Sequence, residues 1–137
     1  MYMTAFTGVG VGVALAIMIG AASAQQPTGP TETKGMAEKV LSAYDLGTQG
    51  LDDWAKRKFR MREIVIAPNG VIAAHSHKER PSLGYVLKGT LTEYRNGTLF
   101  REYKAGDVIT ESTDVTHWVE NKSAEPVTII AIDLVKP

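Results

Sequence analysis

Three histidines are the residues of this sequence whose type and spacing best suit chemistry. His75 and His77 stand one residue apart in "AAHSH", and His117, the third histidine of the chain, follows in "TDVTHWVEN". On an extended strand, residues i and i+2 project to the same side, about 6.5–7 Å apart, and we therefore expect His75 and His77 to point the same way. A neighbouring strand that carries His117 would then complete a site of three imidazole nitrogens.

Three neutral imidazoles suit a divalent transition metal, namely Fe, Mn, Ni, Cu or Zn. They do not suit Ca²⁺ or Mg²⁺, which prefer oxygen ligands. The sequence therefore predicts His75, His77 and His117 as metal ligands. The alternative is that each is an ordinary surface or hydrogen-bonded histidine.

The composition narrows the class of protein. The chain of 137 residues is 44% hydrophobic and 22% charged, which is typical of one soluble globular domain. Lys plus Arg and Asp plus Glu both number 15, and this balance argues against a nucleic-acid partner. No cysteine is present, which excludes disulfides, thiolate metal ligands and a cysteine nucleophile.

The first 24 residues are predicted to be a secretory signal peptide. They contain no charged side chain, and an apolar run from Val9 to Ala21 leads to "ASA" before Gln25, which matches a small-x-small cleavage site. We expect a periplasmic or secreted protein with no stable membrane association after cleavage. The alternative is an uncleaved N-terminal membrane anchor, because about 20 apolar residues can span a bilayer.

Residues 25–35 form a polar segment with two prolines and are expected to be a flexible lead into the domain at residues 36–137. In the domain, short β-like runs alternate with turn signals every eight to twelve residues or so, a pattern typical of an all-β sandwich or small barrel. Asn96-Gly97 is the strongest hairpin signal. One strand is expected to stop at Pro68, in "APNG".

Basic residues alternate along "KRKFRMREIVI". Strand periodicity places one set on a face opposite Phe59, Met61 and Val65; that set is Lys56, Lys58, Arg60 and Arg62. We interpret this face as a solvated basic edge. Two alternatives stay open: Arg60 or Arg62 points into a pocket and holds an anionic substrate by a bidentate contact, or the face is a nucleic-acid patch.

Residues 58–135 resemble the cupin superfamily. The first cupin motif is matched by Gly70, His75, His77 and Gly89, the last at the end of "GYVLKG", and the second motif by Gly106, His117 and Asn121 in "AGDVITESTDVTHWVEN". The resemblance implies an all-β fold, a single-domain jelly-roll barrel of two antiparallel sheets, with the three histidines lining one end. It also implies a homodimer, since family members commonly dimerise.

The sequence departs from the cupin pattern at three places. Ser82 stands where the family has its glutamate ligand, and either Glu79 or Glu111 is a candidate to replace that carboxylate. Gly70 is one residue closer to His75 than usual, and Ser112 and Asp114 replace the proline and glycine of the second motif. Two further predictions concern other residues: Asn121 caps a turn, and three aromatic residues pack rather than contact substrate, namely Tyr85, Tyr94 and Trp118.

The cupin resemblance implies dioxygenases, isomerases, lyases and plain binding proteins as candidate functions, because one fold hosts many chemistries. We expect a periplasmic small cupin with a three-histidine metal site, acting as a metal-dependent oxygenase or related enzyme on a small organic substrate. The alternative is a non-catalytic cupin that binds a small ligand or a metal. A third possibility is an inert scaffold with a vestigial site.

Overall fold

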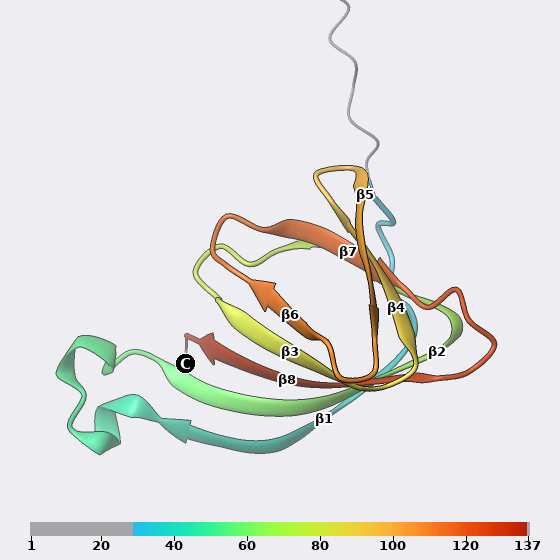
Figure 1. The fold of residues 1–137 in the computed structure, drawn as a ribbon. Helices are drawn as coiled ribbons and strands as arrows, with labels where there is room; N and C mark the ends of the chain where they lie inside the picture. The colour runs from blue at the N-terminus through green and yellow to red at the C-terminus, as the bar shows by residue number, and fades with distance from the viewer. Residues whose placement is uncertain (1–28, 137) are drawn as a thin grey trace, which may run out of the picture.

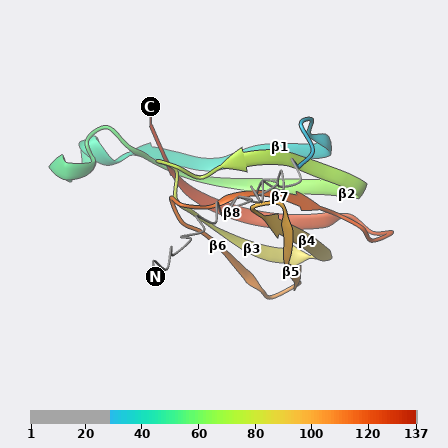
Figure 2. The same ribbon diagram turned by 90° about the horizontal axis from the view of Figure 1, so that it is seen from above.

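Antiparallel strands make up most of the computed structural model, which describes residues 29–136. Two short 3-10 helices, Leu46–Gln49 and Asp52–Trp54, lie between the first two strands and extend beyond the rest of the sheet (Figures 1 and 2). The eight strands are β1 (Lys34–Asp45), β2 (Lys58–Ser76), β3 (Ser82–Lys88), β4 (Thr90–Arg95), β5 (Thr98–Lys104), β6 (Val108–Glu111), β7 (Thr116–Glu120) and β8 (Val127–Val135).

These strands form one barrel-shaped sheet in the order β5-β4-β7-β2-β8-β3-β6, with β1 paired to β2. Figure 1 shows β1, β2, β8 and β3 along one side of the interior, and β7 and β4 along the other. The all-β prediction is therefore confirmed. Among residues 29–136, no helix is long and apolar enough to cross a membrane. The predicted signal peptide, residues 1–24, lies outside the described residues.

Strand β2 does not stop at Pro68 as the sequence suggested, but runs through it to Ser76. Its first half pairs with β8 as far as Ile66, and its second half pairs with β7 from Val71 onward. The residues between form the corner at which the strand passes from one side of the barrel to the other, and Asn69 adopts a φ of 60° there. The chain does change direction near Pro68, but it does so by a bend within one long strand and not by a turn that ends the strand.

The hairpin predicted at Asn96-Gly97 is confirmed. Strands β4 and β5 pair up to Arg95 and Thr98, and the two residues between them have φ values of 49° and 83°. Positive φ at both central residues is the requirement of a type I′ turn, which Asn-Gly meets at little steric cost. This hairpin fixes the register of β4, which carries a residue of the site described below.

The hydrophobic core lies inside the barrel and is built from the inward positions of seven strands, β2 to β8. Its members are buried aliphatic side chains plus one tyrosine: Ile64, Ile66, Val86, Leu91, Tyr103, Ile109, Val119, Val127, Ile129 and Ala131. Strand β1 starts at Lys34, inside the segment expected to be flexible. Within the segment expected to be flexible, the Pro30 carbonyl accepts a hydrogen bond from the Ala74 N–H at 2.8 Å.

Candidate metal centre

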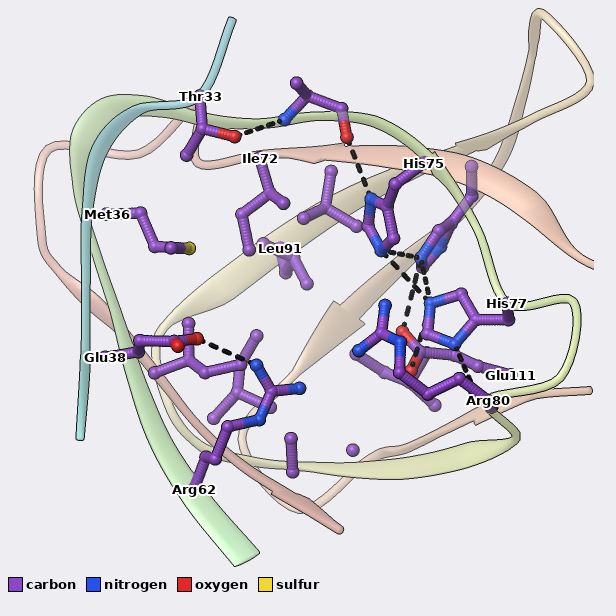
Figure 3. A pocket seen from close by; sticks show the side chains of 18 of the residues that line it. Thr33, Met36, Glu38, Arg62, Ile72, His75, His77, Arg80, Leu91 and Glu111 are labelled. Atoms are coloured by element: carbon purple, nitrogen blue, oxygen red, sulfur yellow. Dashed lines mark hydrogen bonds and ion pairs between the residues drawn. The ribbon is translucent and has the colours of Figure 1, made fainter. Parts of the chain in front are cut away.

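The three histidines predicted as ligands come together at one end of the barrel interior. His75, on β2, is the direct cross-strand partner of His117, on β7, so their side chains lie on the same face. His77 follows two residues after His75, just beyond the end of β2. The Nε2 atoms of the three rings are 3.0–3.1 Å apart in every pair (Figure 3).

Each ring is oriented by a hydrogen bond from its other nitrogen. The Nδ1 atom of His75 lies 2.8 Å from the Ala73 carbonyl oxygen, and that of His77 lies 3.1 Å from the Arg80 carbonyl oxygen. The Nδ1 atom of His117 lies 2.6 Å from a carboxylate oxygen of Glu93. Since all three partners are acceptors, each Nδ1 carries the proton, and in the neutral ring the Nε2 atom is left with its lone pair.

Three Nε2 lone pairs that face one another have no proton to share, and they repel unless a cation lies between them. Two ligands about 2.1 Å from one ion, at right angles to each other, are about 3.0 Å apart, close to the separations found. The donor set is also the one that borderline transition metals prefer. The His75, His77 and His117 cluster could therefore hold a metal ion.

Burial favours the neutral form of His75 and His77, which is the form that metal ligands need. The side chain of His77 is only 2% exposed, and burial lowers its pKa to about 4. Burial also lowers the pKa of His75 below its ordinary value. His77 therefore remains uncharged well below neutral pH, and burial favours the neutral form of His75 as well.

Glu93 is a site residue that the sequence analysis missed. Its side chain, on β4, is fully buried, and it accepts hydrogen bonds from His117, Arg95 and the Tyr103 hydroxyl. Burial opposes ionisation, but these hydrogen bonds outweigh it and hold the pKa of the carboxyl below its ordinary value. A signal existed in the sequence: Glu93 shares a strand face with the core residue Leu91 and is thus a charged residue on an apolar face.

Of the two carboxylates considered as replacements for the missing glutamate, the structure brings Glu111 to the histidines. Its two oxygens lie 3.5 Å from His77 Nε2 and 3.4 Å from His117 Nε2 (Figure 3). Ser82 is the cross-strand partner of Glu111 and donates a hydrogen bond to it. Glu79 instead lies on an exposed loop, where its carboxylate pairs with Lys136 at 2.8 Å.

A cavity of ≈ 290 Å³ adjoins the histidine cluster inside the barrel. All three histidines and Glu111 line it, together with Arg62 and Arg80. The rest of its lining is mainly apolar, and the side chains labelled in Figure 3 include Met36, Ile72 and Leu91. A mostly apolar cavity with a few convergent polar groups is the usual form of a small-molecule site.

The interpretation of Arg60 and Arg62 as part of a solvated basic edge is wrong. Their side chains are 26% and 11% exposed, and both donate hydrogen bonds to Asp133, whose carboxylate is fully buried. The reason is the register of β2, because Arg62 shares its face with the core residues Ile64 and Ile66. On the opposite face, Phe59 is 37% exposed.

The expected turn-capping role of Asn121 is confirmed. Its amide nitrogen donates to the carbonyls of Ile66, Ala67 and Glu125 at 2.8–3.1 Å, away from the histidines. Two of the three aromatic residues pack together as expected, since the Tyr94 and Trp118 rings stack at 4.7 Å; Tyr85 is 45% exposed.

The comparisons with known proteins agree with this fold. The family model described as "Cupin domain" (Cupin_2) matches residues 62–133, more than half of the chain. The chain therefore belongs to this family. A search of curated proteins found no match.

Solved structures share the fold at low sequence identity. The cupin domain of Cnp3 from Schizosaccharomyces pombe has a TM-score of 0.61 and 12% identity, over 77% of this chain and 69% of that one. A predicted oxalate decarboxylase from Thermotoga maritima has a TM-score of 0.59 and 19% identity, over 81% and 90%. A Cupin 2 conserved barrel domain protein from Salinispora arenicola has a TM-score of 0.56 and 20% identity, over 72% and 74%.

Proposed function

We propose that this protein is a metal-dependent enzyme that binds a divalent transition metal through His75, His77 and His117 and acts on a small organic molecule in the adjoining cavity. The observation that carries the proposal is the convergence of three Nε2 lone pairs at the wall of a largely apolar cavity. A protein that only stored metal would have no need of such a cavity beside the ligands.

The protein residues prepare the site before any metal binds. Hydrogen bonds from the three Nδ1 atoms fix the rings, so little reorganisation is needed when an ion enters. Glu93, which its three hydrogen-bond donors keep ionised, accepts a hydrogen bond from the Nδ1–H of His117 and makes that ring a stronger ligand. The apolar lining limits the access of water to the cavity.

Glu111 takes the role of the glutamate that the family has at the position of Ser82. The two residues face each other across β3 and β6, so the carboxylate reaches the histidines from the neighbouring strand. The set of ligands is then three imidazoles and one carboxylate. Ser82 holds the Glu111 carboxylate in place through its hydroxyl.

A bound divalent metal would supply a Lewis acid for an oxygen atom of the substrate and, if it is redox-active, the means of oxidation by dioxygen. Among the enzyme classes of this family, we favour an oxygenase or a related enzyme. We also propose that residues 1–24 direct the protein to the periplasm or outside the cell, because an uncharged apolar run there leads to the small-x-small sequence ASA.

The first test is metal analysis of purified protein by plasma mass spectrometry, with His117→Ala as the variant. We expect close to one transition-metal ion per chain in the wild type and a loss of nearly all of it in the variant. Thr116→Ala is the matched control, because Thr116 is the exposed neighbour of His117 on β7. Full metal retention by His117→Ala would refute the site.

The role of Glu111 has its own test. Glu111→Gln should weaken metal binding by at least about tenfold, the lower end of what the loss of even an outer-shell partner costs. Adding Ser82→Glu to that variant returns a carboxylate to the family position and should restore part of the affinity. Unchanged affinity in Glu111→Gln would show that the carboxylate is not a ligand.

Oxygen consumption with catechols, flavonoids and small keto acids then separates an enzyme from a binding protein. Turnover that disappears in His117→Ala supports the proposal. Tight binding of such compounds to the metal-loaded protein, without turnover, would instead favour the non-catalytic alternative.

A further inference from the structure

Two arginine side chains line the cavity beside the histidine cluster. Arg62 comes from β2, and Arg80 comes from the loop between β2 and β3; Figure 3 shows both guanidinium groups pointing into the interior. Arg80 is tied to the cluster through its backbone, because its N–H donates to the His77 carbonyl at 2.8 Å and its own carbonyl accepts from His77 Nδ1. A group bound by Arg80 therefore lies next to the histidines.

The arginines on this side of the cavity share one buried carboxylate. Arg60, Arg62 and Arg80 all donate to the buried carboxylate of Asp133, at 2.8–3.1 Å. The other acid in the group is Glu38, which pairs with Arg62 at 2.7 Å and is 40% exposed. Three guanidinium groups thus share Asp133. Glu111, which lines the cavity as Glu38 does, faces His77 and His117. Arg80 therefore has no carboxylate partner of its own in the described part of the chain.

Both cavity arginines also have N–H groups that donate no hydrogen bond within residues 29–136. The Nε atom of Arg62 is buried and has no hydrogen-bond partner among residues 29–136. Within the same residues, the Arg80 guanidinium makes a single hydrogen bond, to Asp133, although such a group has five N–H donors. A planar group with several free donors is well suited to bind a carboxylate with two parallel hydrogen bonds.

The remainder of the wall is apolar, which restricts the kind of anion. Met36, Ile72 and Leu91 lie across the cavity from Arg80 (Figure 3). A bare inorganic anion would leave this surface in contact with water, whereas a hydrocarbon or aromatic body would cover it. The volume of ≈ 290 Å³ suits a molecule of modest size.

We propose that the substrate is a small organic acid, whose carboxylate is held by Arg80 and Arg62 and whose apolar body packs against Met36, Ile72 and Leu91. This inference rests on the proposed function, since it names the substrate class of the same site. Because Arg80 adjoins His77, the atoms next to the carboxylate are the ones presented to the metal centre.

The test compares two probes of the same shape, benzoate and benzamide, by isothermal titration calorimetry at constant ionic strength. We expect the protein to bind benzoate at least about tenfold more tightly, because a hydrogen-bonded charge pair is stronger than its neutral counterpart. The preference should persist in metal-free protein, since the arginines do not depend on the metal for their position. Equal affinities, or no detectable binding of either probe, would overturn the proposal.

Arg80→Gln and Arg60→Gln form a matched pair of variants. Each removes one guanidinium group from Asp133. Of the two residues, Arg80 lines the cavity and Arg60 does not. We expect Arg80→Gln to lose most of the benzoate preference and Arg60→Gln to keep it. An equal loss in both variants would assign the arginines a structural role only.

The two proposals fail in different ways. A protein that prefers benzoate but binds no metal would refute the metal centre and leave the organic-acid site standing. A protein that holds one metal ion but does not distinguish the two probes would refute the organic-acid site alone.

Discussion

Glu93→Gln tests how far the buried carboxylate behind His117 controls the metal centre. The substitution keeps the shape of the side chain and one acceptor oxygen, but it removes the negative charge. In the wild-type protein, that carboxylate accepts a hydrogen bond from the His117 Nδ1–H, with an N···O distance of 2.6 Å, and hydrogen bonds from Arg95 and Tyr103. The variant leaves the histidine tautomer unchanged and weakens the hydrogen bond that makes the ring a good donor to metal.

The expected loss can be worked from this one contact. A hydrogen bond to a charged group contributes about 1 kcal/mol more than a neutral one, and outer-shell partners of metal-ligating histidines typically account for about 10–100-fold in affinity. The His117–Glu93 contact is short and both side chains are no more than 1% exposed. We therefore expect a loss of about tenfold or somewhat more, equivalent to about 1.4–2 kcal/mol.

The assay is competition for Zn²⁺ or Mn²⁺ against a chromogenic chelator, with folding checked by circular dichroism. Glu120→Gln is the control, because Glu120 is also a partly buried carboxylate and accepts a hydrogen bond from Trp118, but it does not contact a histidine. If Glu93→Gln and Glu120→Gln both keep wild-type affinity, the argument that Glu93 tunes His117 is wrong.

Two further predictions concern stability. The pKa of His77 in the fold, about 4, is below the 6.5 of the unfolded chain, so the unfolded state binds its proton first as the pH falls. The resulting contribution is complete above about pH 6.5 and is lost towards pH 4; it amounts to at most about 3 kcal/mol. Urea unfolding of metal-free protein should show this pH dependence, and His77→Gln should flatten it; equal slopes would contradict the reasoning. Asn121→Ala should lower the free energy of unfolding by about 2–3 kcal/mol, because it leaves buried carbonyls without a donor. Its metal affinity should match the wild type, and a marked fall in affinity would show that Asn121 acts on the site after all.

Several features of the fold and site were predictable because they depend on residues close in sequence. The i, i+2 spacing fixes His75 and His77 on one side of a strand, and Asn96-Gly97 specifies its hairpin turn. Asn121 could be assigned to a turn from its side-chain chemistry, and its three hydrogen bonds agree. The cupin motifs placed His117 with the other two histidines. The homodimer and the secretory signal remain predictions.

Other features required the pairing of distant strands. The face of β2 that carries Arg62 turned out to point inward. Strand alternation puts Ile64 and Ile66 on that face, and the pairing with β8 in the closed sheet buries it. Alternation in the sequence is symmetrical: it separates two faces but does not say which one is buried. A run of basic residues therefore suggested solvent, although the arginines surround a buried aspartate that lies 73 residues from Arg60 in the sequence.

The sequence by itself determined that this protein has strands, a histidine pair on one of them and a third histidine in the matching motif, because each of these is a property of local spacing. Only the tertiary structure decided what surrounds the cluster. The pairing of Ser82 with Glu111 brings a carboxylate to the place where the family has a glutamate and this sequence has a serine, and the fold buries Glu93 behind His117. Register and burial depend on contacts between distant segments, and a single sequence does not encode those contacts in any local pattern.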